Sequence, residues 1–509
     1  MNMKTCRWFC ATIVPGAILF GQTACAEPEY KANLDKTFSV TPGGRLVISA
    51  DTGSIHVVAG PSDKVEIHVL RKVQGGTKSD ADELFARHEV TFAQEGSTVS
   101  VISRNKHQPS WGWNVHRRFL EVSYEVTAPE QFDMELGTAG GDIRVGDLAG
   151  KLEARTSAGA IHAGKITGST VAKDAGGDIV LAEVGQDVTA GTTSGSIEIQ
   201  KAGANVEASD AGGNIRVGEA GGSVKAQTAS GSITLGAVHG LVTANDAGGD
   251  IHIASANGAV KAETTSGSIS IGSADGEVKA RDAGGDIHID LAKGSVTAQT
   301  TSGSIQIGTV TGESVKAEDQ GGNIEIERAT GAVIAQTTSG SIHIKLALGS
   351  VAATDAGGDI TIDSSGGGAE AQTTSGSIRI GSARGKIDVR DAGGSIHVAN
   401  AGGAVSAETS SGAIDVSFSA APKEDCRIVA LGGDITASLP PAAAMDVDAQ
   451  CLGGNVESEL PLTIQGKTQE GTLQGQLNGG GPKIKLRSTS GNIRLKRSTA
   501  TPIEAEASK

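Results

Sequence analysis

One isoleucine position recurs through the middle of the chain and constrains the fold more than any other feature. It steps by 18 residues from Ile143 to Ile305, by 19 to Ile324, and by 18 again to Ile414. Each step holds two glycine-bearing turns, each followed by a short alternating run, as in DAGGDIHIASANGAVKAE. Such alternation is typical of half-buried strands. The repeat predicts 18-residue coils of two strands, with a one-residue bulge at Ser314 where the step is longer.

Stacked coils of this kind predict an all-β, elongated parallel β-solenoid. Strands in neighbouring coils lie about 4.8 Å apart, so sixteen coils would form a rod roughly 75 Å long. Residues 137–417 contain no Phe, Tyr, Trp, Pro or Cys. A narrow core of Ile, Val and Ala suits that composition, and a proline would remove a ladder hydrogen bond. The strict period also argues against disorder, which glycine- and serine-rich acidic chains otherwise favour.

The turns alternate between DAGGD and TTSGS types, which doubles the period to 36 residues. Like charges stacked on adjacent strands repel, so we expect Thr and Ser hydroxyls to separate and bridge solvated aspartates. Calcium-binding rolls also use 18-residue coils, but their Gly-x-Asp ending is missing here. We therefore predict no metal and no cofactor. The aspartates are Asp174, Asp210, Asp246, Asp282, Asp319, Asp355 and Asp391, and the threonines between them are Thr192, Thr228, Thr264, Thr300, Thr337 and Thr373.

The ends depart from the repeat, and we divide the chain accordingly. The segments are a signal peptide (1–26), a strand-rich N-terminal cap (27–136), the regular solenoid (137–418), wider coils with a C-terminal cap (419–497), and a disordered tail (498–509). The cap should hide the open edge of the stack. It is expected to hold one short helix, Ser79–His88, with Leu84 and Phe85 inward. Its predicted strands are Arg45–Ser49, Ser54–Val58, Lys64–Val69, Thr98–Ile102 and Leu120–Thr127.

The N-terminus predicts export. Lys4 and Arg7 precede an apolar stretch of 13 residues, too short to span a bilayer, and cleavage after small residues would leave Glu27 first. Lipid anchoring at Cys25 is the alternative, although Gln22 stands where a lipobox has leucine. We expect a periplasmic, outer-surface or secreted protein with no transmembrane segment.

Charge and cysteine content narrow the partners. The net charge of −15 disfavours nucleic acid. After signal cleavage only Cys426 and Cys451 remain. Aligning the LGGDI and LGGNV turns places Cys426 level with Val447, and Cys451 level with Ala430. Both thiols then point inward and lie about 13 Å apart along the strand direction. We therefore predict that they are buried and do not form a disulfide.

One basic and aromatic segment stands out in the N-terminal cap. It could bind an anionic glycan or an envelope protein. Alternatively its tryptophans pack over the first coil as a lid, which is the interpretation we favour because the cap needs core. The candidate residues are Arg104, Lys106, His107, Trp111, Trp113, His116, Arg117 and Arg118.

No catalytic constellation emerges from the repeat. Every acidic or basic position in the array recurs from coil to coil, whereas an enzyme needs a distinctive cluster in a cleft. His252, His288, His343 and His397 share one outward column but are too far apart to bind one metal ion. We predict a non-enzymatic structural or interaction protein, with a carbohydrate-binding or carbohydrate-active β-helix protein as the alternative.

Three motifs carry a family resemblance. They are PGGRLVISADTGSIHV near the start, the repeated TSGSI and AGGDI turns, and the terminal GGGPKIKLRSTSGNIRL. With these motifs the chain resembles a bacterial putative-adhesin family of unknown biochemical function, over most of its mature length. The resemblance implies a β-solenoid and an adhesin-like role, and it supplies no catalytic residues. The long, regular middle array departs from the family pattern.

Overall fold

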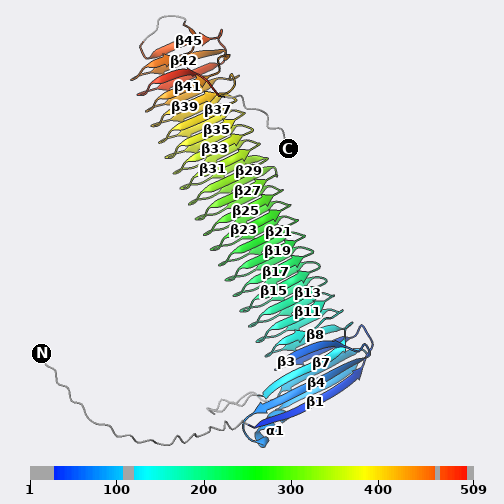
Figure 1. Cartoon of the computed structure of the whole chain (residues 1–509). Helices are drawn as coiled ribbons and strands as arrows, with labels where there is room; N and C mark the ends of the chain where they lie inside the picture. Colours follow the sequence, from blue (N-terminus) through cyan, green and yellow to red (C-terminus); the bar gives the residue numbers. More distant parts are fainter. Residues whose placement is uncertain (1–27, 107–119, 465–469, 501–509) are drawn as a thin grey trace, which may run out of the picture.

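The structure is a computed structural model that describes residues 28–106, 120–464 and 470–500. Nearly all of the regular secondary structure in these residues is β-strand, stacked into a straight rod (Figure 1). About 17 parallel coils follow one another, and the one helix of the described residues lies at the N-terminal end. The predicted all-β, parallel β-solenoid is confirmed.

Each coil contributes one strand to each of two facing sheets. Sheet A takes the Ile-x-Ile strand and sheet B takes the shorter Val-x-Ala strand. In the array, sheet A consists of β9 (Ile143–Val145), β11 (Ile161–Ile166), β13 (Ile179–Val184), β15 (Ile197–Ala202), β17 (Ile215–Ala220), β19 (Ile233–Val238), β21 (Ile251–Ala256), β23 (Ile269–Ala274), β25 (Ile287–Ala292), β27 (Ile305–Val310), β29 (Ile324–Ala329), β31 (Ile342–Ala347), β33 (Ile360–Ser365), β35 (Ile378–Ala383), β37 (Ile396–Ala401), β39 (Ile414–Phe418) and β41 (Ile435–Leu439). Sheet B consists of β8 (Asp133–Thr138), β10 (Leu152–Arg155), β12 (Thr170–Lys173), β14 (Val188–Gly191), β16 (Val206–Ser209), β18 (Val224–Gln227), β20 (Val242–Asn245), β22 (Val260–Glu263), β24 (Val278–Arg281), β26 (Val296–Gln299), β28 (Ser314–Glu318), β30 (Ala332–Gln336), β32 (Val351–Thr354), β34 (Ala369–Thr373), β36 (Ile387–Asp391), β38 (Val405–Thr409) and β40 (Cys426–Ala430).

The register of the array follows the repeat. Ile269 pairs with Ile251 on one side and Ile287 on the other, all parallel. The one extra residue is absorbed differently from the prediction. Ser314 is in regular register with Ala332, so the insertion lies in the turn between Val310 and Ser314. A turn can lengthen without breaking the ladder, whereas a bulge leaves a strand residue unpaired.

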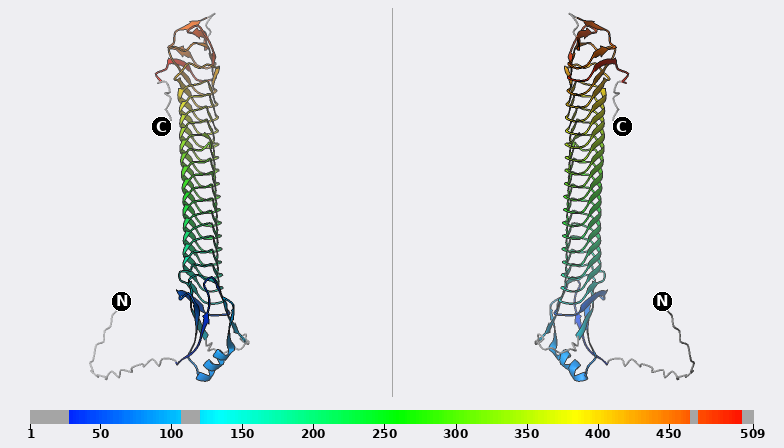
Figure 2. Two further views of the ribbon diagram at one scale, coloured as in Figure 1. Left: turned by 90° about the vertical axis from the view of Figure 1, so that its right-hand side faces the viewer. Right: turned by 90° about the vertical axis from the view of Figure 1, so that its left-hand side faces the viewer.

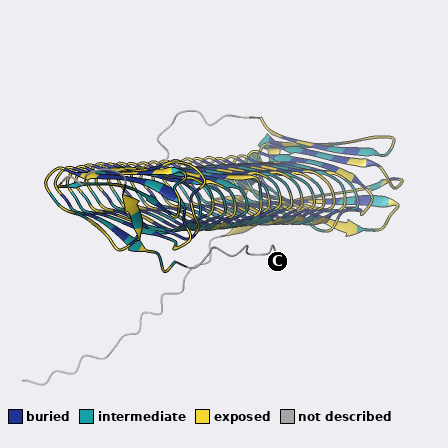
Figure 3. Ribbon diagram, turned by 90° about the horizontal axis from the view of Figure 1, so that it is seen from above, coloured by how far each residue is buried: buried dark blue, intermediate teal, exposed yellow. Residues whose placement is uncertain are grey.

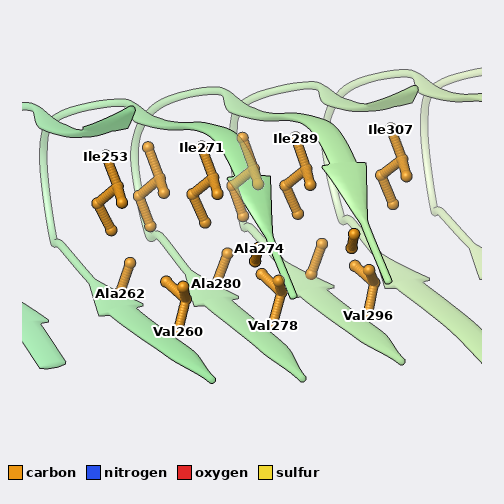
Figure 4. Packing of buried hydrophobic residues seen from close by; sticks show 14 of the residues in the cluster. Ile253, Val260, Ala262, Ile271, Ala274, Val278, Ala280, Ile289, Val296 and Ile307 are labelled. Carbon is orange, nitrogen blue, oxygen red and sulfur yellow. The ribbon is translucent and has the colours of Figure 1, made fainter. Parts of the chain in front are cut away.

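The core is a thin apolar layer between the sheets. Isoleucines such as Ile253 and Ile271 point from sheet A toward Val260 and Ala262 of sheet B (Figure 4). All four are at most 2% exposed. Buried and exposed residues alternate along the strands, as Figure 3 shows. The small Ala and Val side chains of sheet B let the two sheets approach closely, which gives the narrow rod of Figure 2.

One glycine in each turn is required by the spacing of the coils. A Cβ built on Gly267 would lie 2.0 Å from the carbonyl oxygen of Gly249 in the preceding coil, and one on Gly285 would lie 2.1 Å from that of Gly267. Real Cβ atoms do not approach backbone oxygen so closely. The invariant third residue of the TSGSI and AGGDI turns therefore follows from backbone packed on backbone.

At the N-terminal end the spatial order of the coils differs from the chain order. The first coil in sequence lies between the array and a coil that comes later in the chain. Arg45 pairs with Asp133 on one side and with Thr98 on the other. The inner coil is β2 (Arg45–Ala50) with β3 (Ser54–Gly60), and the outer coil is β6 (Thr98–Asn105) with β7 (Leu120–Pro129).

Three antiparallel strands and the helix finish this end. They are β1 (Glu29–Ser39), β4 (Lys64–Gln74), β5 (His88–Glu95) and α1 (Lys78–Arg87). Thr77 and Asp80 form a capping box that starts the helix. Ala81 is the buried residue of α1, while Leu84 and Phe85 are only half-buried. The five predicted strands are present in lengthened form, but the sequence did not indicate β1 or β5.

The C-terminal end is interleaved in the same way. Ile484 pairs with Cys426 on one side and with Val447 on the other, so the last coil in sequence is the penultimate coil in space. An antiparallel hairpin, β44–β45, ends the stack. The elements are β42 (Met445–Cys451), β43 (Val456–Ser458), β44 (Leu462–Ile464), β45 (Thr472–Leu477), β46 (Lys483–Ser488) and β47 (Ile493–Arg497).

Both cysteines are buried and free, as predicted. The predicted register is also correct, because Ala430 and Cys451 both pair with Ser488. The intervening β46 separates the two thiols further than the alignment implied. Burial raises the pKa of the Cys426 thiol, which keeps it protonated and poorly reactive.

The first residue of the predicted tail (498–509), Ser498, is hydrogen bonded to the solenoid. The Ser498 N–H donates to the Leu439 carbonyl at 2.8 Å, and its hydroxyl donates to the Phe418 carbonyl at 2.8 Å. Residues 501–509, and the signal peptide with Cys25, lie outside the described residues.

Candidate interaction surfaces

The aspartates of the DAGGD turns are buried, contrary to the expectation that they are solvated. Asp282 is 7% exposed. Its Oδ1 accepts from the Gly284 N–H at 3.0 Å and its Oδ2 from the Gly285 N–H at 2.8 Å. Burial raises the pKa of Asp282, and these N–H donors partly oppose the shift. The carboxylate therefore serves as the acceptor that holds its own turn.

The threonines between the aspartates bond to backbone, not to carboxylates as we expected. The Thr300 hydroxyl donates to the Gly285 carbonyl at 3.0 Å and accepts from the Gly303 N–H at 3.3 Å. The alternation still keeps buried carboxylates two coils, or about 10 Å, apart. Thr and Asp thus both supply hydrogen bonds to the backbone groups of equivalent turns, and Thr does so without a charge.

A second ladder runs beside the first at the end of each turn. Asp286 Oδ1 accepts from the Ser304 N–H at 2.7 Å, the Ser304 hydroxyl accepts from the Asn323 N–H at 3.4 Å, and Asn323 Oδ1 accepts from the Ser341 N–H at 2.8 Å. Each side chain thus caps the next coil. Within the described residues, no group of three or more His, Cys, Asp or Glu could hold a metal ion.

The outward face of sheet B carries shallow open grooves. A first groove of about 550 Å³ crosses β14, β16, β18 and β20. A second of about 440 Å³ crosses β30, β32, β34 and β36 at the same positions of the coil. Leu241, 57% exposed, lies on the first and Ile334, 41% exposed, on the second.

A hydrogen-bonded row lines the first groove. Asp187 Oδ1 accepts from the Asn205 N–H at 3.1 Å, Asn205 Oδ1 accepts from the Ser223 N–H at 2.9 Å, and the Ser223 hydroxyl accepts from the Leu241 N–H at 3.1 Å. Beside it, Lys225 pairs with Glu207 at 2.8 Å. Sequence reasoning missed both grooves, although the exposed Leu241 and Ile334 were the available signal.

The predicted basic and aromatic patch is only partly described. Arg104 on β6 pairs with Asp51 at 3.2 Å, and Lys106 pairs with Glu89 at 2.8 Å. Both cations are thus matched by neighbouring carboxylates. His107, Trp111, Trp113, His116, Arg117 and Arg118 lie outside the described residues.

Sequence reasoning also missed a buried polar cluster in the N-terminal cap. His88 Nε2 lies 2.7 Å from the Ser103 hydroxyl and 3.3 Å from the Tyr124 hydroxyl. Burial lowers the pKa of His88, and the Arg71 cation lowers it further. Burial also raises the pKa of Tyr124 to about 12. Because His88 is 2% and Ser103 0% exposed, this hydroxyl–imidazole pair is closed to any substrate.

One protein-family model matches nearly the whole length of the rod. The Toastrack DUF4097 family model matches residues 45–319 and 308–496. The chain belongs to the Toastrack DUF4097 family. In this Toastrack chain the matched region starts at the first residue of β2 and ends within β47, so it spans both interleaved ends.

Two solved structures are similar to this Toastrack chain only at a low level. A "putative cell adhesion protein" from Clostridium sporogenes is 7% identical, with a TM-score of 0.14, covering 92% of this chain and 100% of its own. A "putative adhesin" from Bacteroides fragilis is 14% identical, with a TM-score of 0.14, covering 69% of this chain and 97% of its own. No curated protein sequence matches the chain.

The structure was also inspected for helices that could cross a membrane. Among residues 28–106, 120–464 and 470–500, no helix has the length and apolar character needed to cross a bilayer.

Proposed function

We propose that this Toastrack chain is a non-enzymatic interaction protein, an adhesin-like rod that acts outside the cytoplasm. The observation that carries the proposal is the recurrence of open grooves at the same coil positions on the outward face of sheet B. A straight rod presents these two grooves to one partner at two separate points. Several weak contacts on one rigid body gain affinity through effective concentration.

The chemistry of the grooves favours a glycan or an envelope protein as partner. The first groove offers hydroxyl, amide and carboxylate groups beside the exposed Leu241. Sugar hydroxyls need such donors and acceptors, so carbohydrate binding is the second candidate function. The carboxylates there already have partners, since Asp187 accepts from Asn205 and Glu207 pairs with Lys225. That arrangement supports binding without catalysis.

Binding to glycan and envelope-protein arrays tests the proposal. Glu207→Ala with Lys225→Ala and Leu241→Ser alters the first groove and should weaken the strongest ligand by about tenfold, or about 1.4 kcal/mol. Lys201→Ala with Glu219→Ala is the matched control, because that pair has a similar separation of 3.1 Å but lies on sheet A. Equal affinity of the groove variant and the wild type would contradict the assignment to sheet B.

Export is part of the proposal and rests on the N-terminal sequence. Mass spectrometry of the protein from its native cells distinguishes the alternatives. A mature chain that begins at Glu27 supports simple cleavage, and an acylated N-terminal Cys25 supports lipid anchoring. A full-length chain recovered from the cytoplasm would contradict export.

The basic and aromatic segment of the cap is a separate proposal with its own test. If its tryptophans pack as a lid, Trp111→Ala with Trp113→Ala lowers the melting temperature and leaves ligand binding intact. If the double variant stays as stable as the wild type but loses attachment, the segment is a binding site.

A further inference from the structure

The outward column of sheet A carries an unusual concentration of histidine. Strand pairing brings the outward residue after the first isoleucine of each sheet A strand into one continuous line from β3 to β39. Six of the eleven histidines of the chain stand on this line. They are His56, His162, His252, His288, His343 and His397.

The fold does not require histidine at these positions. Outward residues of this column face solvent, and Thr234, Ser270 and Gln306 occupy the same register. The corresponding outward column of sheet B, which runs through Lys261 and Lys279, contains no histidine in β10 to β40. A histidine row on one face only points to a property of that face.

The fixed charges of the column balance, because its three arginines are matched by its three carboxylates. Its six histidines are spread along about 70 Å, and histidine is the side chain type whose ordinary charge change lies between pH 8 and 5. The arginines are Arg144, Arg216 and Arg379, and the carboxylates are Glu198, Glu325 and Asp415.

Three histidines of the column lie beside carboxylates. His288 lies 2.6 Å from Asp290, His343 lies 3.1 Å from Asp363, and His397 lies 3.4 Å from Asp415. These histidine side chains remain 38–46% exposed, so a ligand can reach them. The other facing charges are Glu125 and Arg144 beside His56, Arg144 beside His162, Glu325 and Lys345 beside His343, and Arg379 beside His397.

We propose that this histidine column binds a linear anionic polysaccharide under mildly acidic conditions. The column is one side chain wide, and its histidines lie two to five coils, or roughly 10–24 Å, apart. A ligand must therefore extend along the rod to contact several of them. Residues 137–417 contain no Phe, Tyr or Trp on which bases could stack, so single-stranded nucleic acid is disfavoured. This surface is on the opposite sheet from the grooves of the proposed function and does not depend on them.

Binding of polygalacturonate to the purified mature protein, at one ionic strength, tests the proposal. Affinity should rise about tenfold or more from pH 7.5 to 5.5, as added charges do in polyelectrolyte binding, and should fall with salt. His252→Gln, His288→Gln, His343→Gln and His397→Gln combined should abolish that rise. His68→Gln with His239→Gln, which lie off the column, should retain it.

Several results would overturn the proposal. They are equal affinity at both pH values, an undiminished rise in the fourfold variant, and equal binding of uncharged dextran. Tighter histidine-dependent binding of duplex DNA or anionic vesicles would reject a polysaccharide as the partner. Because every substitution is on an exposed side chain, unchanged melting temperatures check that the variants are folded. The sheet B groove variant should bind polygalacturonate normally, so this test and that of the proposed function can fail separately.

Discussion

The middle of the rod and its two ends use the same coil but connect it differently. In the array, each coil stacks on the coil 18 residues before it, as Ile269 does on Ile251. At the ends, a coil is inserted between two that are distant in sequence. Arg45 pairs with Thr98 and Asp133, and Ile484 pairs with Cys426 and Val447.

The comparison shows that the array determines the length of the rod, whereas the interleaved ends close the stack. Array contacts are nearest-neighbour contacts, so array stability grows by similar increments, as in other repeat proteins. The interleaved ends need long loops to close before their contacts form, which costs entropy. In return, the outermost coil cannot fray alone, because the inserted coil holds it to the array.

Deletions should show the largest contrast. Removing residues 246–281 deletes one DAGGD and one TTSGS coil and rejoins Asn245 to Asp282 in the same register. We expect a folded, shorter rod with nearly the same melting temperature. Removing residues 479–509 deletes β46 and β47 and leaves β40 and β42 without their shared neighbour, so we expect aggregation or a loss of several degrees. Circular dichroism melts with light scattering measure both, and equal stability of the two deletions would remove the distinction.

Within the array, an inward charge should cost far more than an outward one. Ile269→Asp buries an unpaired carboxylate and should destabilise by more than about 4 kcal/mol, or prevent folding. Ser270→Asp lies on the solvent face and should change stability by no more than about 0.5 kcal/mol. Chemical denaturation of both variants provides the measurement. Similar midpoints would show that the two residues do not differ in burial.

Two adjacent glycines should differ in their tolerance of a methyl group. A Cβ at Gly285 would lie 2.1 Å from the Gly267 carbonyl oxygen, whereas one at Gly284 would lie 3.2 Å from the Thr265 carbonyl oxygen. Gly285→Ala should therefore cost about 1–3 kcal/mol through forced backbone shifts. Gly284→Ala serves as the control and should cost clearly less. A larger loss for Gly284→Ala would contradict the coil-packing explanation.

The N-terminal end, unlike the array, should weaken in acid through His88. Burial and Arg71 lower the folded-state pKa of His88 below its unfolded value, while Asp51 opposes them. A lowered histidine pKa means that the unfolded state takes up the proton first. The stabilisation is complete above about pH 6.5 and is lost as pH falls through the folded-state pKa.

Hydrogen exchange can locate this effect. Between pH 7.5 and 5, after correction for intrinsic exchange rates, peptides from β5 should lose protection while peptides from β23 keep it. His88→Gln should lose less protection in acid than the wild type. Uniform loss along the rod, or a wild-type response in the variant, would exclude His88 as the cause.

Calcium should have the smallest effect of all. The Asp282 oxygens already accept backbone N–H donors, so a cation would have to displace them. Millimolar Ca²⁺ or EDTA should leave the melting temperature of the rod unchanged. A calcium-dependent rise would show that the turn carboxylates can rearrange into a metal site.

The sequence predicts the array well because one local rule governs it. Inward residues such as Ile251 and Ala262 recur at the same positions of each 18-residue coil. Parallel, in-register stacking then determines which outward residues of successive coils lie side by side. It cannot predict the order of coils at the ends, because the GGDI, GGNV and SGNI turns are equivalent stacking units. It also missed the burial of Asp282, since turn acids are usually solvated, and the His88 cluster, whose members are brought together only by β5, β6 and β7.

Chain order at the C-terminal end also affects biosynthesis. Synthesis delivers β42 before β46, and both align with β40 in one register, with Val447 and Cys426 each opposite Ile484. A nascent chain can therefore place β42 directly on β40 and close the end prematurely. The native arrangement requires that contact to stay open until the later strands β46 and β47 are in place. Any early β40–β42 contact must therefore break before this end can close, so the lifetime of that contact becomes a determinant of correct assembly.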